Sequence, residues 1–445
     1  MTTRIAARLL AAGFALGVAG GAARAFAQAP PAPPALSSST AQVLTLNDAL
    51  KLARENSPEI QAALAATGTA HTAAVQARSG ILPNLSLTGG YTYTQPNSTG
   101  SGVFVANNGP DEYIAQANVH EALSLAGTAG YRSAAAAEDL AKAQQEIVSR
   151  GLLVTVVLRY DALVVAQRKQ ATAQLASRDA QQFLTMSEDR ERGGEAAHAD
   201  VIKAQIQLQQ RQRELREADL GFRTSQNELA IVLFPTYRTD FSVTDDLEAP
   251  APLPALDVVQ RQAARHNPAI AAATAALRQA HQDVWVARGE MLPSLAVDYF
   301  YGLDANQFST MVDGLNLLGS SVVASVSVPI WNWGASESQL ATAHLRERQA
   351  RTDLSFAQRQ LLADLHSLYD EAQAARAELD SLKQSADLAA ESLRLTTLRY
   401  QAGEATALEV VDAQTTLIDS RNAYDDGQAR YHLALANLQT LTGSF

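Results

Sequence analysis

The sequence contains no cysteine among its 445 residues. Disulfide bonds, thiolate chemistry and an N-terminal cysteine carrying a lipid are therefore excluded. Aromatic residues make up only 6% of the chain. Beyond the first 27 residues no apolar run reaches the roughly 18 residues that a membrane-spanning helix needs. The other way across a bilayer is a closed β-barrel, in which every backbone polar group is paired between strands.

Blocks of basic residues are also missing. The chain begins with Arg4 and Arg8, continues with an apolar stretch, and reaches Ala25-Phe26-Ala27, which predicts a secretory signal peptide over residues 1–27. The alternative, a single membrane anchor, is disfavoured because the apolar run is short and rich in glycine. Cleavage changes the formal net charge from −11 to −14. Nothing in the remaining charge pattern indicates a nucleic-acid partner.

The sequence lacks the common motifs of catalysis and metal binding. Its eight histidines form no H-E-x-x-H pattern, and His198 is expected to be solvated. A glycine-rich phosphate loop and a nucleophile elbow are absent as well. We therefore expect no enzymatic activity, no cofactor and no bound metal.

The chain contains an internal duplication. Pro58 and Pro83 are 25 residues apart, and so are Pro268 and Pro293. Near the end of each half, RGGEAAHADVIKAQ resembles YQAGEATALEVVDAQ. The matching residues, each 209 positions apart, are Gly194 and Gly403, Glu195 and Glu404, Asp200 and Glu409, and Gln205 and Gln414.

The duplication predicts two structural repeats, over residues 42–233 and 253–445. Each is expected to have a helix of about 25–40 residues that ends at a Leu-Pro pair. Two strands around a polar loop then follow, and after them two long helices joined by a glycine turn. Residues 28–41 are expected to be extended, and residues 234–252, rich in Pro and Asp, form a connector.

Alternation of apolar and polar residues marks the strands, and their length suits a tilted membrane strand of about 9–11 residues. The predicted strands are residues 85–94, 113–125, 295–302 and 320–331. One face can meet lipid and the other water, although a soluble pair of β-hairpins fits the same pattern. Four strands cannot enclose a pore, so the membrane interpretation requires several subunits.

Aromatic residues gather toward the end of the strand before each long loop, where a bilayer interface would suit them. These predicted interface residues are Tyr91, Tyr93, Tyr299, Phe300 and Tyr301.

Long helices follow the strands in each half. Apolar residues recur every seven positions, which is typical of a left-handed coiled coil. One such series is Leu365, Ala372, Leu379, Ala386, Leu393 and Tyr400. The predicted helical hairpins cover about residues 128–233 and 335–443, with turns at Gly193, Gly194 and Gly403. About 65 helical residues would span roughly 100 Å, and hairpins arranged in a ring would leave a tunnel.

These features resemble the TolC-type outer-membrane efflux proteins over nearly all of the chain after the signal peptide. The resemblance rests on the duplication, the N-x-P and L-P-x-L pairs, and above all RYQAGEATALEVVDAQTTL at residues 399–417. It implies an α+β membrane protein: a homotrimeric twelve-stranded β-barrel, with four strands per subunit, continued by a long α-helical coiled-coil barrel. The barrel would lie in the lipid of the outer membrane and the helices in the periplasm.

The resemblance also implies a passive exit channel of a tripartite efflux or type I secretion system. Its partners would be a periplasmic adaptor protein and an inner-membrane pump, either of the proton-driven RND type or an ABC transporter. Contact with them would open the channel at its helical tip. The alternative is a structural periplasmic or surface coiled-coil protein without a pore. No part of the sequence identifies the exported cargo.

By the same resemblance, a gate lies at the tip. Glu409 and Asp412 match two acidic ring positions, Asp200 matches the acid of the first repeat, and Tyr400 matches its tyrosine partner. Six carboxylates around a threefold opening would favour cations, whereas the alternative for these acids is a solvated helix face. The family's gate arginine falls on Ala405. Candidates for an ionic link are Arg192, Arg399 and Lys203.

Overall fold

The computed structural model describes residues 42–94, 110–247, 251–312 and 314–443. The predicted signal peptide and the segment 28–41 lie outside these residues. The chain divides after Gln42 into two units, and the architecture below is that of the unit Val43–Phe445. In the described part of the chain, no helix is both long and apolar enough to cross a membrane.

Each half begins with two helices where the sequence predicted one. They are α1 (Leu46–Asn56) and α2 (Pro58–Ser79) in the first half, and α5 (Leu256–His266) and α6 (Pro268–Gly289) in the second. The helix breaks before the proline because a residue preceding proline disfavours helical dihedral angles. Ser57 and Asn267 then cap the next helix by accepting hydrogen bonds from the backbone N–H of Ile60 and Ile270.

Four antiparallel strands form the main sheet, in the order β2-β3-β5-β8. Their bounds are β2 (Asn84–Tyr93), β3 (Asp111–Leu123), β5 (Ser294–Ala305) and β8 (Leu318–Ser327). The last strand stops short of the predicted residue 331, and Pro329, which has no N–H to donate, lies just beyond its end. A short hairpin, β6 (Met311–Val312) with β7 (Leu315–Asn316), lies between β5 and β8.

Strand β5 continues three residues past its predicted end at Gly302. A Cβ on Gly302 would lie 2.2 Å from the carbonyl oxygen of Ala115, so glycine permits close strand pairing here and does not end the strand. As a result Tyr299 and Tyr301 lie within the strand, with Tyr301 paired to Ala117. Phe300 points to the opposite face from these two tyrosines, because side chains alternate along a strand.

The face that carries Tyr299 and Tyr301 is largely apolar and exposed. The register places Leu85 opposite Val119, Val119 opposite Tyr299, and Tyr299 opposite Val322, across all four strands. The other face carries Asn118, His120 and Asp298, whose side chains hydrogen bond to one another through Asp298. The sheet therefore has one apolar and one polar face.

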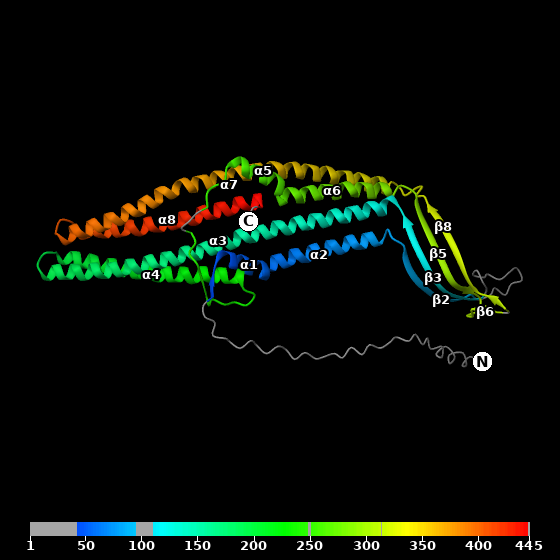
Figure 1. The fold of residues 1–445 in the computed structure, drawn as a ribbon, viewed down its shortest axis with the longest axis horizontal. Helices are drawn as coiled ribbons and strands as arrows, with labels where there is room; N and C mark the ends of the chain where they lie inside the picture. Colours follow the sequence, from blue (N-terminus) through cyan, green and yellow to red (C-terminus); the bar gives the residue numbers. More distant parts are fainter. Residues whose placement is uncertain (1–41, 95–109, 248–250, 313, 444–445) are drawn as a thin grey trace, which may run out of the picture. The chain divides into compact units, whose positions relative to one another are not determined.

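Four long helices complete the fold (Figure 1). They are α3 (Leu125–Arg192), α4 (His198–Leu233), α7 (Ala335–Gln401) and α8 (Ala407–Thr442). Helices α3 and α4 form one hairpin, α7 and α8 form the other, and α3 packs against α8. The buried residues of α7 include Leu365, Ala372, Leu379 and Tyr400, one of the predicted seven-residue series. At about 1.5 Å per residue, α3 and α7 each span roughly 100 Å.

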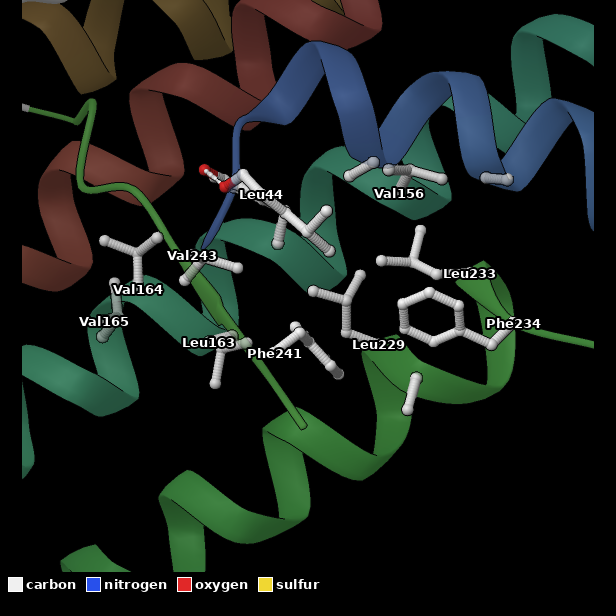
Figure 2. Packing of buried hydrophobic residues seen from close by; sticks show 14 of the residues in the cluster. Leu44, Val156, Leu163, Val164, Val165, Leu229, Leu233, Phe234, Phe241 and Val243 are labelled. Carbon is white, nitrogen blue, oxygen red and sulfur yellow. Dashed lines mark hydrogen bonds between the residues drawn. The ribbon is translucent and has the colours of Figure 1, made fainter. Parts of the chain in front are cut away.

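A second, two-stranded sheet, β1 (Gln42–Leu44) with β4 (Phe241–Val243), packs against α3 and α4. Figure 2 shows Leu44, Phe241 and Val243 meeting apolar side chains of both helices. The buried hydroxyl of Tyr160 donates a hydrogen bond to the carbonyl oxygen of Thr244 at 2.8 Å. The connector between the two halves is thus anchored on the first hairpin.

Candidate functional site at the two helix bends

The α3–α4 and α7–α8 hairpins turn with the same backbone hydrogen bonds. We call residues 189–200 the first bend and residues 398–409 the second bend. In the first, the N–H groups of Gly193, Gly194 and Glu195 donate to the carbonyls of Asp189, Glu191 and Arg190 at 3.0, 2.9 and 2.8 Å. In the second, those of Ala402, Gly403 and Glu404 donate to Leu398, Tyr400 and Arg399 at 3.0, 3.1 and 2.8 Å. Each pair of matching residues is 209 positions apart.

Glycine is needed at one position in each bend. Gly194 has a φ of 78° and Gly403 a φ of 80°, a left-handed conformation that is costly for other residues. Gly193, predicted as part of the turn, has a φ of −75°, which any residue can adopt. The turn therefore depends on Gly194 and Gly403, while Gly193 is the C-cap of α3.

The helices that leave the bends begin differently. Helix α8 begins with a capping box, in which the Thr406 side chain accepts from the N–H of Glu409 at 3.3 Å. The carboxylate of Glu409 in turn accepts from the N–H of Thr406 at 3.0 Å. The N-cap of helix α4 is Ala197, whose side chain cannot accept a hydrogen bond. Only the second bend thus satisfies free N–H groups of its helix with its own side chains.

Of the predicted gate acids, Glu409 already has partners within its own bend. The backbone N–H of Thr406, more than any other group, holds the pKa of Glu409 below its usual value, and Arg399, 3.4 Å away, acts in the same direction. Asp412 is exposed on α8. The Oδ1 atom of Asp200 lies 3.9 Å from the Nζ atom of Lys203 on the same helix.

Tyr400 is buried between the hairpins, with 3% of its surface exposed. Its hydroxyl lies 3.2 Å from the Ser187 hydroxyl, and its ring centroid lies 5.2 Å from that of Phe183. The guanidinium of Arg190 donates a hydrogen bond to the Tyr400 carbonyl and stacks over the ring, 4.9 Å from its centroid. Tyr400 therefore joins the second hairpin to the first beside the bends.

The sequence did not identify Arg190, Ser187 or Phe183 as part of this contact. Arg190 had a signal, because it lies 209 residues before Arg399, one of the predicted candidates for an ionic link. Around them, all four long helices contribute to one buried apolar cluster. Its members are Phe183, Leu184, Val201, Ala204, Tyr400, Ala407 and Val410.

The arginines predicted to replace the family's gate residue bond locally. Arg399 donates to the carbonyl of Glu404 at 3.1 Å, and Arg192 bonds to Asp189. Both contacts stay inside one bend, whereas Arg190 reaches from the first hairpin to the second.

Exposed aromatic residues lie at both ends of strands in the main sheet. Near the long loop, the Tyr91 hydroxyl donates to Asp111 at 2.7 Å, and its ring packs on Tyr113. Between β8 and α7, Trp331 and Trp333 are 75% and 89% exposed, with ring centroids 5.8 Å apart. This tryptophan pair was missed, although the sequence PIWNW after a predicted strand marks it.

The described residues contain no group of three or more His, Asp or Glu side chains that could hold a metal ion. The charged groups at the bends are engaged mainly with backbone groups and with neighbours in the same hairpin. The bends therefore join the helices and leave carboxylates exposed.

Comparison with known proteins agrees with this architecture. The family described as "Outer membrane efflux protein" matches residues 49–233 and 259–444. The pyoverdine export outer membrane protein OpmQ of Pseudomonas putida is 27% identical over 87% of this chain and 83% of its own length. The outer membrane protein TolC of Vibrio cholerae is 23% identical over 88% of this chain and 89% of its length.

Solved structures share the fold. The outer membrane protein VceC of Vibrio cholerae has a TM-score of 0.78 at 20% identity, covering 89% of this chain and 96% of that protein. The CmeC outer membrane channel of Campylobacter jejuni has a TM-score of 0.75 at 17% identity, covering 89% and 85%. The predicted role in outer-membrane efflux is confirmed, and the pore-less alternative receives no support. The chain belongs to the outer membrane efflux protein family, as its resemblance to TolC-type proteins predicted.

Proposed function

We propose that three copies of this chain form one continuous exit duct, with a twelve-stranded barrel in the outer membrane and a helical tunnel in the periplasm. The observation that carries the proposal is the four-stranded sheet with its apolar, exposed face. Its outer strands, β2 and β8, each have one partner strand among the residues that the structure describes. Unpaired strand edges are costly in lipid, and pairing β2 of one copy with β8 of the next would close the sheet.

The exposed apolar face supports a lipid-facing role. Leu87 is 83% exposed and Val326 is 66% exposed, which would be unfavourable for a sheet surrounded by water. Tyr91 and Tyr93 near the long loop, and Trp331 and Trp333 beyond the opposite end of β8, suit the two interfaces of a bilayer. Tyr299 and Tyr301 would then face lipid within the barrel wall, and Phe300 would face its interior.

The bends would form the periplasmic tip, where an adaptor protein and an inner-membrane pump engage and open the duct. The pump would be of the proton-driven RND type or an ABC transporter. The names of three relatives refer to different substrates, namely pyoverdine export, alkaline protease secretion and cobalt-zinc-cadmium resistance, although their sequences are similar to this chain. We therefore assign the choice of cargo to the pump, with this chain as a passive conduit.

The test is to purify the protein from outer membranes and measure its mass and its conductance in planar lipid bilayers. The expected result is a heat-resistant trimer that conducts ions. A water-soluble periplasmic monomer without conductance would contradict the proposal.

The tip acids have a test of their own. Replacing both Glu409 and Asp412 by alanine should reduce cation selectivity and weaken block by multivalent cations, because up to six carboxylates would leave the trimeric opening. Asp387→Ala serves as the control, because it removes an exposed acid of α7 that lies outside the second bend. An unchanged reversal potential in the double variant would remove these two residues from the gate.

A further inference from the structure

We infer that Arg190 is the positioning residue that holds the two hairpins of one subunit together at the tip, and that it acts through the carbonyl and ring of Tyr400. The hydroxyl of Tyr400 contributes little to this link. The inference rests on the proposed function, because a link between the hairpins affects transport only if the tip is a gate.

The guanidinium of Arg190 makes two contacts with the opposite hairpin at once. It donates a hydrogen bond to the carbonyl oxygen of Tyr400 and lies over the ring of the same residue. That carbonyl belongs to the last turn of α7, the negative end of the helix, which attracts positive charge, and it also accepts a hydrogen bond from the N–H of Gly403 at 3.1 Å. The Arg190 side chain is only 16% exposed, so water competes weakly for these contacts.

Groups of both bends lie close to the guanidinium. Its Nε lies 3.6 Å from the carboxylate of Glu195, across the first bend. A Cβ on Gly403 would lie 3.4 Å from its terminal nitrogen, so the second bend also approaches Arg190 closely. The cation is therefore enclosed by the first bend on one side and the second on the other.

The other candidates for the link are weaker. Within the described part of the chain, the Tyr400 hydroxyl hydrogen bonds to the Ser187 hydroxyl alone, at 3.2 Å. A hydrogen bond between two neutral groups contributes less than one to a charged group. Arg399, in the position equivalent to Arg190, contacts Glu404 and Glu409 of its own bend. Arg192 is 74% exposed and pairs within its own turn.

The experiment compares four full-length proteins: the unaltered chain, Arg190→Ala, Tyr400→Phe and the control Arg192→Ala. Conductance in planar bilayers reports the open population. Because the chain has no cysteine, spin labels can be attached at Ala199→Cys and Leu408→Cys, two exposed positions on α4 and α8. Their separation, measured by pulsed electron paramagnetic resonance in detergent, reports hairpin spacing without relying on a pore.

We expect Arg190→Ala to raise the open population about tenfold, equivalent to ~1.4 kcal/mol, and to lengthen the label separation. Arg192→Ala should match the unaltered chain in both measurements, and Tyr400→Phe should change them far less than Arg190→Ala. Unchanged conductance and spacing in Arg190→Ala would overturn the inference, and so would a Tyr400→Phe effect as large as that of Arg190→Ala.

If Arg190→Ala does not assemble, Arg190→Lys keeps the charge but loses the planar group that both donates and stacks. It should still lengthen the label separation, and an unchanged separation would overturn the inference.

The link made by Arg190 and the proposed duct can fail separately. An unaltered chain that never conducts, with labels that still separate in Arg190→Ala, refutes the duct and keeps the link. Conduction in every variant with unchanged spacing refutes the link and keeps the duct.

Discussion

In the first bend the N-cap of α4 is an alanine, which gives no side-chain hydrogen bond, whereas in the second bend α8 has the capping box of Thr406 and Glu409. The turns themselves are alike, with matching backbone hydrogen bonds and one left-handed glycine each. The backbone of the turn therefore requires a glycine, while the start of the next helix can be completed in different ways.

The bends also differ in how they contact each other. Arg190 of the first bend reaches the second hairpin, while its counterpart Arg399 stays within its own bend. The side chains Arg399, Thr406 and Glu409 of the second bend thus bond within that bend, whereas Arg190 of the first bend adds a contact between the hairpins.

The largest expected effect is from replacing the left-handed glycines. Gly403→Ala should lower the free energy of unfolding by about 1–2 kcal/mol, because an L-residue is strained at this φ. Gly194→Ala should cost about as much, because Gly194 is also left-handed and neither added Cβ would come closer than 3.4 Å to another atom. Denaturant unfolding of the purified protein measures both.

The matched control for these variants is Gly193→Ala. Its φ of −75° suits alanine, so its stability should be unchanged or slightly higher. Equal losses in all three variants would show that the left-handed conformation is not what the turns require.

The next effect concerns the cap. Thr406→Ala should destabilise the protein by ~1 kcal/mol, the usual cost of losing a threonine N-cap. Ala197→Thr should add stability to the first bend, because it places a side-chain acceptor where α4 has none. Thr416→Ala, on the exposed face within α8, controls for the substitution itself. If Ala197→Thr gives no gain in denaturant unfolding, the first bend is unable to form the cap.

The sequence was informative about the bends because their geometry is local. A glycine that must be left-handed and a cap three residues from its acid can be recognised from residue types and spacing. The same holds for the helix breaks at Pro58 and Pro268, which follow from proline chemistry even though they were not predicted.

What could not be predicted depends on packing between distant segments. The partner of Tyr400 is Arg190, 210 residues away, and nothing in the local sequence specifies that contact. Phe300 was grouped with Tyr299 and Tyr301 by its position in the chain, yet strand alternation places it on the opposite face. Strand β5 was expected to end at Gly302, because a glycine that allows close pairing looks the same in sequence as one that ends a strand.

A smaller difference between the bends is expected in how the stability of the protein depends on pH. The pKa of Glu409 lies below its ordinary value of 4.5, so the folded state binds fewer protons here than the unfolded state. Its contribution to stability is therefore present above pH 4.5 and is lost as the pH falls through the lowered pKa. Glu409→Gln should lack this part of the acid dependence in denaturant unfolding between neutral pH and about pH 3. Identical pH profiles would mean that the cap does not depend on the charge of Glu409.

The smallest effect should come from the counterpart of Arg190. Arg399 is 53% exposed and lies 3.4 Å from Glu409, and exposed ion pairs of this kind contribute only a few tenths of a kcal/mol. Arg399→Ala should therefore lower stability slightly, with a loss that shrinks further as salt is added, because salt screens exposed charges. Unfolding of Arg399→Ala at low and high ionic strength measures this. A large, salt-independent loss would indicate that Arg399 is buried against another subunit in the assembled protein, and the contrast with Arg190 would then hold only within a single chain.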